Sequence, residues 1–581
     1  MLSTTFVLAS AGSIHWLDGA VIVVYLLGIT SLGVYSGRQV KKSSDFFMPR
    51  RFGKAMMIMH AFGTGTASDQ AVTVASATVR NGLSGIWYQW LWLLVTPFYW
   101  IFAPIMRRFR ATTTADVYQL RYDKSVALLF AIVGIASMVA KIGLLLKGTG
   151  ALIDAGTGGL INADLAIVVT TILFLIYGLA GGLGAAIVTD FIQGVLTLLF
   201  SFMLLPFVLV AVGGLTGAKT TLAEAGLGDK WSLVAPGEIG LFWIIMLSIQ
   251  TLIGIVGIPS AMGNSAAGKT ELEGRLGYMT GTFIKRVCTA AWCLTGIGAL
   301  AYYLQQGVDV STIHPDSVYG DMARQFLPVG LLGVFIASLL AGIMSSCDSF
   351  MISAAALFTE NIYRPLRRNE TNRHYLFMGR TAAVLIVAAG MIFAFWLSGV
   401  IAGLMIWLKI LPMMGIAFWL GLFWRKTTPL GAWASTLTGF TSWWLAERVF
   451  FAEWLATLPF ANTLRLTIDQ GRQVEMYEPW LIVFYLTMAV LAGLLVSLFT
   501  PKVPEERLNR YYQLTRTPIQ PGEVIETPCE LPAGVQPADR KMLITACGLE
   551  IPRPSKLAMQ GFAIGWMGVF GLIFGFIWLV S

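Results

Sequence analysis

Four polar side chains interrupt an apolar stretch at residues 339–358, whose sequence is LLAGIMSSCDSFMISAAALF. They are Ser345, Ser346, Asp348 and Ser349. Helical spacing places three of them on one stripe with Gly342, and Ser346 lies beside that stripe. Hydroxyl and carboxylate oxygens grouped in this way suit a small hard cation. Serines that hydrogen-bond between helices are the simpler alternative, but they do not explain the aspartate.

A second polar interruption lies at residues 60–72, HAFGTGTASDQAV. Two glycines and two threonines at 63–66 make this stretch a poor continuous helix. An unwound segment inside a membrane protein frees carbonyl oxygens that can coordinate a cation, whereas a helix-packing face of small residues is the alternative. Asp69 favours the first interpretation, because a carboxylate near the bilayer centre costs about 2.5–3.5 kcal/mol and is not expected to face lipid.

Other charged residues within apolar segments need a reason for their position. Asp190 follows the loop-like sequence LIYGLAGGLGAAIVTD at 175–190, so we expect it about one turn into its own helix, facing the interior. Four lysines also lie in apolar runs. For each of them, a side chain that extends to the membrane surface is at least as good an explanation as one that faces the interior of the protein. They are Lys141, Lys147, Lys285 and Lys409.

The composition indicates which kind of protein positions these residues. Of the 581 residues, 56% are hydrophobic and only 12% are charged, whereas about 25% of a soluble domain is charged. The mean hydropathy is +0.72, and apolar runs of about 20 residues, each long enough to cross a bilayer, recur along the chain. We therefore expect an all-α polytopic membrane protein. The five cysteines and four histidines have no disulfide or metal-ligand spacing, so no transition metal is expected.

The apolar runs predict about 14 membrane spans. They lie at residues 17–37, 53–82, 85–106, 125–149, 160–178, 184–213, 239–260, 277–304, 326–363, 376–398, 400–424, 429–447, 479–500 and 557–580. Arginine and lysine are concentrated in alternate connections such as 38–54 and 107–124, while 150–163 has neither. The positive-inside rule places the basic connections in the cytoplasm and both termini outside a plasma or inner membrane. This bias explains the net charge of +9 without a nucleic-acid partner.

One long polar segment, residues 501–556, separates the last two predicted spans. It is rich in proline and lacks helical periodicity over most of its length, so we predict an irregular cytoplasmic linker to the final span. A regulatory or partner-binding role is the alternative, although the composition alone favours a linker.

Three ordered motifs resemble those of the sodium/solute symporter family, which includes sodium-coupled sugar, proline and sialic-acid transporters. LIYGLAGGLGAAIVTDFIQG at 175–194 resembles the fifth-helix motif of that family. SSCDSFMISAAALFTENIY at 345–363 and GLFWRKTTPLGAWASTLTG at 421–439 resemble two later motifs. The resemblance extends from about Asp18 to about residue 450. It departs at single positions, and Gly178 stands where Ser, Thr, Ala or Val is usual.

The resemblance implies a leucine-transporter-type fold, in which two inverted repeats of five helices surround a site at the membrane midplane. One extra span precedes the repeats and three follow them. The implied parts are the extra span and a cytoplasmic loop at 1–52, repeat one at 53–213, an extracellular loop at 214–238, repeat two at 239–424, two additional spans at 425–500, the linker at 501–556 and the last span at 557–581. The sequence GIVGIPSAMGN at 254–264 is then the expected helix break of the second repeat.

The resemblance also implies cation sites. In the family, a shared sodium site takes carbonyls from the broken first repeat helix and from the eighth helix, with two serine hydroxyls. The matching residues are Gly63, Thr66, Gly342, Ser345 and Ser346. Some members hold a second sodium through an aspartate and serines, which Asp190, Ser345 and Ser349 match. Asp348 stands where another serine is expected, so it either strengthens cation binding or leaves one carboxyl of the pair protonated.

For the solute, sugar transporters of the family use a glutamine after the break and a lysine of the seventh helix, which Gln70 and Lys285 match. Asp69 matches an acidic neighbour of that glutamine. A Gln-Arg pair that usually follows the sixth helix is absent from SAMGNSAAGK at 260–269, so the resemblance leaves the identity of the solute open.

The function implied is sodium-coupled symport of a small polar solute, a sugar, an amino acid or a carboxylate, by alternating access. Sodium is the expected coupling ion, and no organic cofactor is expected. Two alternatives are proton-coupled symport and a solute-sensing receptor that keeps the transporter fold. An enzyme is not expected, because the apolar segments contain no HExxH motif, phosphate-binding loop or nucleophile and base pairing.

Overall fold

The structure is a computed structural model that describes residues 15–37, 46–235, 239–469, 473–520, 522–525 and 527–581. The described part is mostly helical. Its helices of ten or more residues are α1 (Trp16–Gly37), α3 (Lys54–Gly65), α4 (Ser68–Asn81), α6 (Thr96–Arg108), α8 (Lys124–Thr157), α9 (Ala163–Met203), α11 (Gly214–Glu224), α12 (Leu241–Gly254), α14 (Glu271–Gln305), α16 (Leu331–Ala356), α18 (Asn372–Trp396), α19 (Val400–Phe423), α20 (Pro429–Ala446), α23 (Glu478–Phe499), α24 (Glu505–Arg516) and α25 (Lys556–Val580).

Shorter elements connect these helices. They are α5 (Trp87–Trp90), α7 (Thr114–Arg121), α10 (Leu205–Ala211), α13 (Ser260–Ala266), α15 (Val318–Phe326), α17 (Arg364–Leu366), α21 (Val449–Ala456) and α22 (Ala461–Leu464). Two antiparallel hairpins are also present, β1 (Thr467–Asp469) with β2 (Val474–Met476), and β3 (Met542–Ala546) with β4 (Leu549–Pro552). Both hairpins lie in connections between apolar helices, so they do not form part of the helical bundle.

Nine helices of the described residues are long and apolar enough to cross a membrane, and the bent pair α12 and α13 makes a tenth candidate. The other predicted spans fall on shorter or broken helices. These are α3 with α4, α5 with α6, the first half of α9, and α20. The bundle is therefore a polytopic helical membrane protein, as its composition predicts.

Two helices are broken where the sequence predicts breaks. α3 ends at Gly65 and α4 begins at Ser68, because Thr66 and Ala67 have an extended backbone with φ of −128° and −137°. In the second half of the chain, α12 and α13 meet at 75°. Pro259 lies at this bend and lacks the N–H that a continuous helix would need. Each break interrupts the regular hydrogen bonding of a helix inside the protein.

The loop-like segment at 175–190 contains a kink at which the two halves of α9 meet. α9 runs through this segment, and only Gly182 has a non-helical backbone, with φ of +59° and ψ of −164°. A Cβ at this position would also lie 2.7 Å from the backbone oxygen of Phe46, so glycine alone fits the kink. Asp190 therefore lies in the second half of α9, about two turns beyond the kink, where about one turn was expected.

The polar stretch of residues 345–349 lies on α16, which is buried in the middle of the bundle. α16 packs against α8, α9, α1 and the broken helix α3. Its four polar side chains, Ser345, Ser346, Asp348 and Ser349, are each at most 1% exposed. They face protein and not lipid, as the aspartate required.

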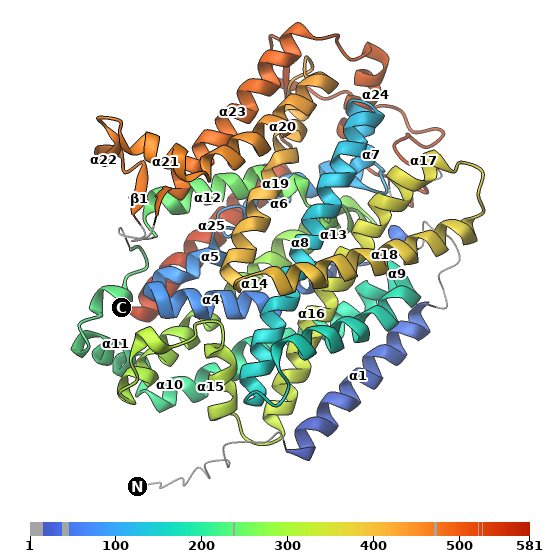
Figure 1. Cartoon of the computed structure of the whole chain (residues 1–581). Coiled ribbons are helices and arrows are strands. Elements are labelled where there is room, and N and C mark those ends of the chain that lie inside the picture. The colour runs from blue at the N-terminus through green and yellow to red at the C-terminus, as the bar shows by residue number, and fades with distance from the viewer. Residues whose placement is uncertain (1–14, 38–45, 236–238, 470–472, 521, 526) are drawn as a thin grey trace.

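The two ends of the bundle carry different sets of connections. Figure 1 shows α7, α17 and α24 together at the upper right, and α10, α11, α15 and the C-terminus at the opposite end. At that opposite end, Trp231 Nε1 donates to the carbonyl of Val580 at 2.8 Å. Asp18 accepts from the N–H groups of Gly330 and Gly333, both at 2.7 Å. The connections predicted to be extracellular thus lie at one end, and several basic connections lie at the other.

The segment predicted to be an irregular linker is partly folded. Residues 501–556 contain α24 and the β3–β4 hairpin. α24 buries Leu508, Tyr511 and Leu514, and the N–H of Arg425 donates to the carbonyl of Gly548 at 2.8 Å. Sequence periodicity missed this helix because it has only 12 residues within a proline-rich segment.

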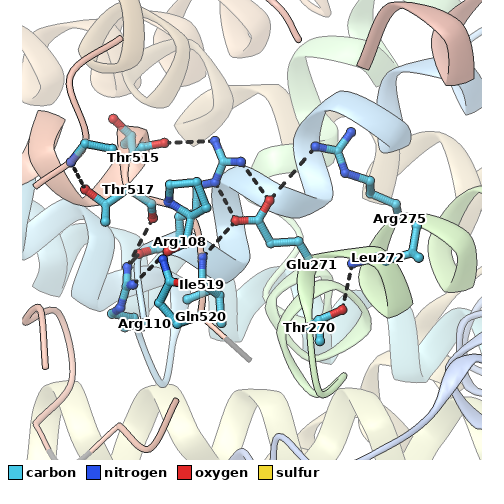
Figure 2. A network of polar contacts seen from close by, with 12 residues as sticks. Arg108, Arg110, Thr270, Glu271, Leu272, Arg275, Thr515, Thr517, Ile519 and Gln520 are labelled. Atoms are coloured by element: carbon cyan, nitrogen blue, oxygen red, sulfur yellow. Dashed lines mark hydrogen bonds and ion pairs between the residues drawn. The ribbon is translucent and has the colours of Figure 1, made fainter. Parts of the chain in front are cut away.

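Buried ion pairs and hydrogen bonds connect this segment to the end of α6 and the start of α14. Figure 2 shows the carboxylate of Glu271, the first residue of α14, in contact with Arg108 of α6 and with Ile519 of the segment. Arg108 Nε and Nη2 donate to the two carboxylate oxygens of Glu271 at 2.6 and 2.7 Å, and the N–H of Ile519 donates to the same carboxylate at 3.1 Å. Arg110 forms a second pair with Glu523 at 2.6 Å, with side-chain exposures of 0% and 2%. The segment therefore joins helices of both predicted repeats.

We expect Glu523→Ala to loosen this segment, because the variant leaves the Arg110 guanidinium buried without its carboxylate, at a cost of about 3–5 kcal/mol. Limited proteolysis should then cleave residues 517–540 faster than in the unmodified protein. Glu505→Ala is the matched control, since Glu505 is 76% exposed in its pair with Arg425 and such pairs contribute about 0–1 kcal/mol. Equal cleavage rates for the two variants would contradict the conclusion that the Arg110–Glu523 pair holds this segment in place.

Candidate functional site

The candidate cation site lies where α16 crosses the break between α3 and α4. The carbonyl oxygen of Gly63 accepts from Ser346 Oγ at 3.0 Å and from the N–H of Thr66 at 3.1 Å. A Cβ on Gly63 would lie 2.6 Å from Oγ of Ser345, so alanine at this position would displace the serine hydroxyl. The fold thus brings a carbonyl at the break and two serine hydroxyls together.

Gly342 and Thr66 lie along the same contact. A Cβ on Gly342 would lie 3.5 Å from the carbonyl oxygen of Thr66. Thr66 is fully buried, and its hydroxyl has no hydrogen-bond partner among the described residues. All five residues matched to the shared sodium site therefore lie on the facing surfaces of α16 and the α3–α4 break.

Asp190 lies beside this group and is hydrogen-bonded on both oxygens. Ser345 Oγ donates to Oδ1 at 2.5 Å, and His60 Nδ1 lies 2.6 Å from Oδ2. Thr64 Oγ1 lies 3.1 Å from Ser349 Oγ and 3.3 Å from the His60 ring nitrogen. Asp190 and Ser349 are therefore linked through α3, as parts of one polar cluster.

His60 is a member of this cluster that the sequence analysis did not single out. It lies on α3, about one helical turn before Gly63, and is only 1% exposed. The sequence could have indicated this role, because His60 begins the polar stretch HAFGTGTASDQAV. A histidine buried in an apolar helix needs a hydrogen-bond partner. The partner, Asp190, is distant in the sequence.

Asp348 and Gly178 both differ from the family pattern, and the two residues lie against each other. A Cβ on Gly178 would lie 2.6 Å from Oδ1 of Asp348 and 2.8 Å from Cε of Met351. A larger residue at 178 would therefore displace the Asp348 carboxylate and the Met351 methyl group, and serine at 348 would remove the first of these contacts. Tyr25 of α1 lies close enough to interact electrostatically with both Asp190 and Asp348. Asp348 thus faces α9 and α1, on the side of α16 that also carries the Asp190 cluster.

We expect Gly178→Ala to destabilise the protein by about 1–3 kcal/mol, the usual effect of overpacking. Adding Asp348→Ser should restore part of the lost thermal stability, because the shorter side chain removes the 2.6 Å contact and leaves only the contact with Met351. Gly571→Ala in α25 is the control, since a Cβ there meets nothing within 4 Å. Thermal unfolding of the three variants tests this, and a double variant no more stable than Gly178→Ala would show that the two positions are independent.

A cavity opens beside the break and shares residues with the candidate cation site. Its lining includes Thr64, Gly65 and Ser346 from the cation side, together with Gln70 of α4. The charged residues of the lining are Lys141 of α8 and Lys285 and Arg286 of α14. An occupant of the cavity would therefore contact the same unwound segment that forms the candidate cation site.

Two of the three predicted solute-binding residues line this cavity. Gln70 Nε2 donates to the carbonyl of Gly65 at 2.6 Å, and Lys285 donates to the same carbonyl. Asp69 is fully buried outside the lining, where Lys141 Nζ donates to its Oδ2 at 2.8 Å. Lys141 and Lys285 therefore face the interior of the bundle, and neither reaches for the membrane surface.

Comparison with known proteins supports the motif-based prediction of the family. The family model described as Sodium:solute symporter family matches residues 46–439. The chain belongs to this family. A sodium/glucose cotransporter of Vibrio parahaemolyticus is 25% identical over 467 residues, covering 72% of this chain and 83% of the relative. A sodium/pantothenate symporter of Escherichia coli is 24% identical over 454 residues, covering 72% of this chain and 88% of the relative.

Further relatives of the family are similar in length and fold. A high-affinity proline transporter of Bacillus subtilis is 24% identical over 434 residues, covering 70% of this chain and 87% of the relative. The solved structure of a Na⁺-coupled sialic acid symporter has a TM-score of 0.68 and 17% identity, covering 84% of this chain and 99% of that one. This likeness shows the fold, and the named relatives are transporters and not enzymes.

Proposed function

We propose that this chain is a secondary active transporter that couples sodium to the symport of a small polar solute by alternating access. Family membership supports sodium-coupled symport. The observation that carries the proposal is the Gly63 carbonyl at the helix break, which lies against the hydroxyls of Ser345 and Ser346. A cavity that shares Ser346 lies next to it. Cation and solute would therefore act on the same segment of α3.

The proposed sodium ligands fit a small hard cation. Gly63, Thr66 and Gly342 would contribute backbone carbonyls, and Ser345 and Ser346 would contribute hydroxyls. Sodium supplies a positive charge at this contact when bound. The residues themselves hold the α3–α4 break against α16, and Gly65 and Gln70, next to the break, line the cavity. Because linkage is reciprocal, sodium and solute should each raise the affinity for the other, by about 1–3 kcal/mol of coupling.

A second cation position is proposed around Asp190, Asp348 and Ser349. Asp190 and Asp348 place two carboxylates near Tyr25, and Ser349 is joined to the cluster through Thr64. His60 and Ser345 already occupy the two oxygens of Asp190. A cation there must therefore replace one of these contacts, so its binding is coupled to the packing of α3.

The membrane arrangement is proposed to have about 14 spans, with two inverted repeats at 53–213 and 239–424. The two broken helices support this arrangement, because α3 with α4 begins the first repeat and α12 with α13 begins the second. The end that carries α7, α17 and α24 is proposed to be cytoplasmic, since it is rich in arginine. Both termini would then lie outside a plasma or inner membrane.

Uptake by reconstituted protein tests the proposed function even while the solute is unidentified. Proteoliposomes are incubated in yeast extract under an inward sodium gradient, and retained solutes are quantified by mass spectrometry. We expect at least one small polar solute to accumulate that does not accumulate under an equal potassium gradient. If no solute depends on the sodium gradient, the chain is not a sodium symporter for these compounds and the receptor alternative gains support.

A further inference from the structure

The cavity beside the helix break has an unbalanced charge. Its lining contains Lys141, Lys285 and Arg286 but no aspartate or glutamate. Lys141 is balanced by Asp69, at 2.8 Å, just outside the lining. Lys285 and Arg286 form no ion pair with a described residue. The cavity wall therefore carries an excess of positive charge.

The contacts of these two residues are to neutral groups. Lys285 donates to the carbonyl of Gly65, and Arg286 donates to the carbonyl of Gln89. The Nζ of Lys285 lies 5.8 Å from the ring centroid of Trp92, and the Cζ of Arg286 lies 5.9 Å from the same centroid. Arg286 Nε has no hydrogen-bond partner among the described residues. Carbonyl and aromatic contacts offset only part of the cost of burying two cations.

The carboxylates of the candidate cation site do not balance this charge. Asp190 already accepts from Ser345 and contacts His60, and Asp348 lies against Gly178. Both lie outside the cavity lining, and the proposed sodium would share their negative charge. A negative group inside the cavity would compensate Lys285 and Arg286.

Unpartnered acceptors in the same cavity indicate what else the occupant carries. Oε1 of Gln70, Oε1 of Gln89 and Oδ1 of Asn264 have no hydrogen-bond partner among the described residues. All three side chains belong to the cavity lining and are at most 5% exposed. The Gln70 amide is oriented by its Nε2 bond to Gly65, which leaves its oxygen available to a donor in the cavity. Hydroxyl or N–H groups on the occupant would satisfy these buried acceptors.

We propose that the co-transported solute is a small hydroxylated carboxylate, whose negative group binds at Lys285 and Arg286 and whose hydroxyls donate to Gln70, Gln89 and Asn264. This proposal rests on the proposed symport function and specifies its substrate class. A neutral sugar would satisfy the amide oxygens but leave both cations without a negative partner. The symport of an anion with sodium also avoids carrying a bare negative charge through the membrane interior.

Matched solute pairs test the substrate class. The yeast extract in the proteoliposome assay is supplemented with glucuronate and glucose, gluconate and sorbitol, and glycerate and glycerol, in which a carboxylate replaces a neutral carbon group. We expect the sodium-dependent solutes to be carboxylates, accumulated about tenfold or more above their neutral partners. Preferential accumulation of a net-neutral or cationic solute would overturn the proposal and leave sodium symport intact. Absence of any sodium-dependent solute would instead reject the underlying function.

A charge-removing variant tests the assigned residues. Lys285→Gln should lower carboxylate accumulation about tenfold or more, and it should lower the preference for the carboxylate over its neutral partner by a similar factor. Lys147→Gln is the matched control, because Lys147 is on α8, half-buried, and not part of the cavity lining. A sodium-induced rise in the unfolding temperature of Lys285→Gln is the control that the variant is folded. Unchanged carboxylate preference in a folded Lys285→Gln protein would overturn the assignment.

Discussion

Ser346→Ala should raise the sodium concentration that half-maximally stabilises the purified protein by about tenfold or more. The reason is the position of the Ser346 hydroxyl, which donates to the Gly63 carbonyl at 3.0 Å and lies between the candidate cation site and the cavity. Alanine removes one proposed ligand and leaves the buried carbonyl with one hydrogen bond fewer. Thermal unfolding in increasing sodium chloride, with choline chloride at constant ionic strength, measures the effect.

Ser353→Ala is the matched control for this prediction. Ser353 is on the same helix, and its hydroxyl donates to the carbonyl of Ser349, one turn earlier, at 2.7 Å. This hydrogen bond is local, so its loss should leave the sodium dependence of the unfolding temperature unchanged. Equal effects of the two alanine variants would indicate that general loss of packing in α16, and not a lost ligand, explains the change.

Lys141→Met is expected to destabilise the protein by about 3–5 kcal/mol, because it leaves the Asp69 carboxylate buried without its partner. The Lys141 and Asp69 side chains are 5% and 1% exposed, and their charged atoms are 2.8 Å apart. Lys141 Nζ also lies 4.7 Å from the ring centroid of Trp407. Methionine would replace this cation–π contact with an apolar one. The expected result is a lower unfolding temperature in the absence of any solute.

A double variant separates the ion pair from simple packing. Asp69→Asn combined with Lys141→Met should recover much of the stability, because no uncompensated charge is left. Lys409→Met is the control, since the glutamates that pair with Lys409 are 35% and 23% exposed and stay hydrated. The interpretation would be wrong if the double variant were less stable than Lys141→Met alone.

The sequence predicted those parts of the site whose signal is local. Glycines and threonines at 63–66 predicted the α3–α4 break. A carboxylate among serines in an apolar run predicted that α16 is buried. In both cases a single segment carries residues that lipid or a continuous helix would disfavour, so the segment alone was sufficient for the prediction. The α12–α13 bend was expected from the family resemblance together with the glycines and proline at 254–264.

The remaining features depend on contacts between distant segments. Lys141 faces the interior because Asp69, on another helix, lies 2.8 Å away, and sequence alone could not distinguish this from a lysine at the membrane surface. His60 belongs to the site because α9 brings Asp190 to it. In the sequence, Gly178 could be recognised only as an unusual residue for the family. The structure shows that a side chain at this position would meet the carboxylate of Asp348.

Two features of the predicted fold differ in detail from the structure, and both differences have local causes. The glycines at 175–190 predicted an interruption, which a single positive φ at Gly182 makes as a kink between the two halves of α9. The prolines of 501–556 indicated an irregular linker, yet α24 fits between them, and its arginines and glutamates contact other segments. Turn-forming residues show where a helix bends or ends, and they do not show how far the chain then departs from helix.

Direct sodium binding tests the central claim that α16 and the α3–α4 break form the cation site. Purified protein is titrated with ²²Na⁺ in a scintillation proximity assay, in parallel with Ser346→Ala and Ser353→Ala. We predict saturable binding to the unmodified protein and to Ser353→Ala that unlabelled sodium displaces and potassium does not, with binding to Ser346→Ala weakened by about tenfold or more. Equally tight binding of sodium to folded Ser346→Ala would contradict the account.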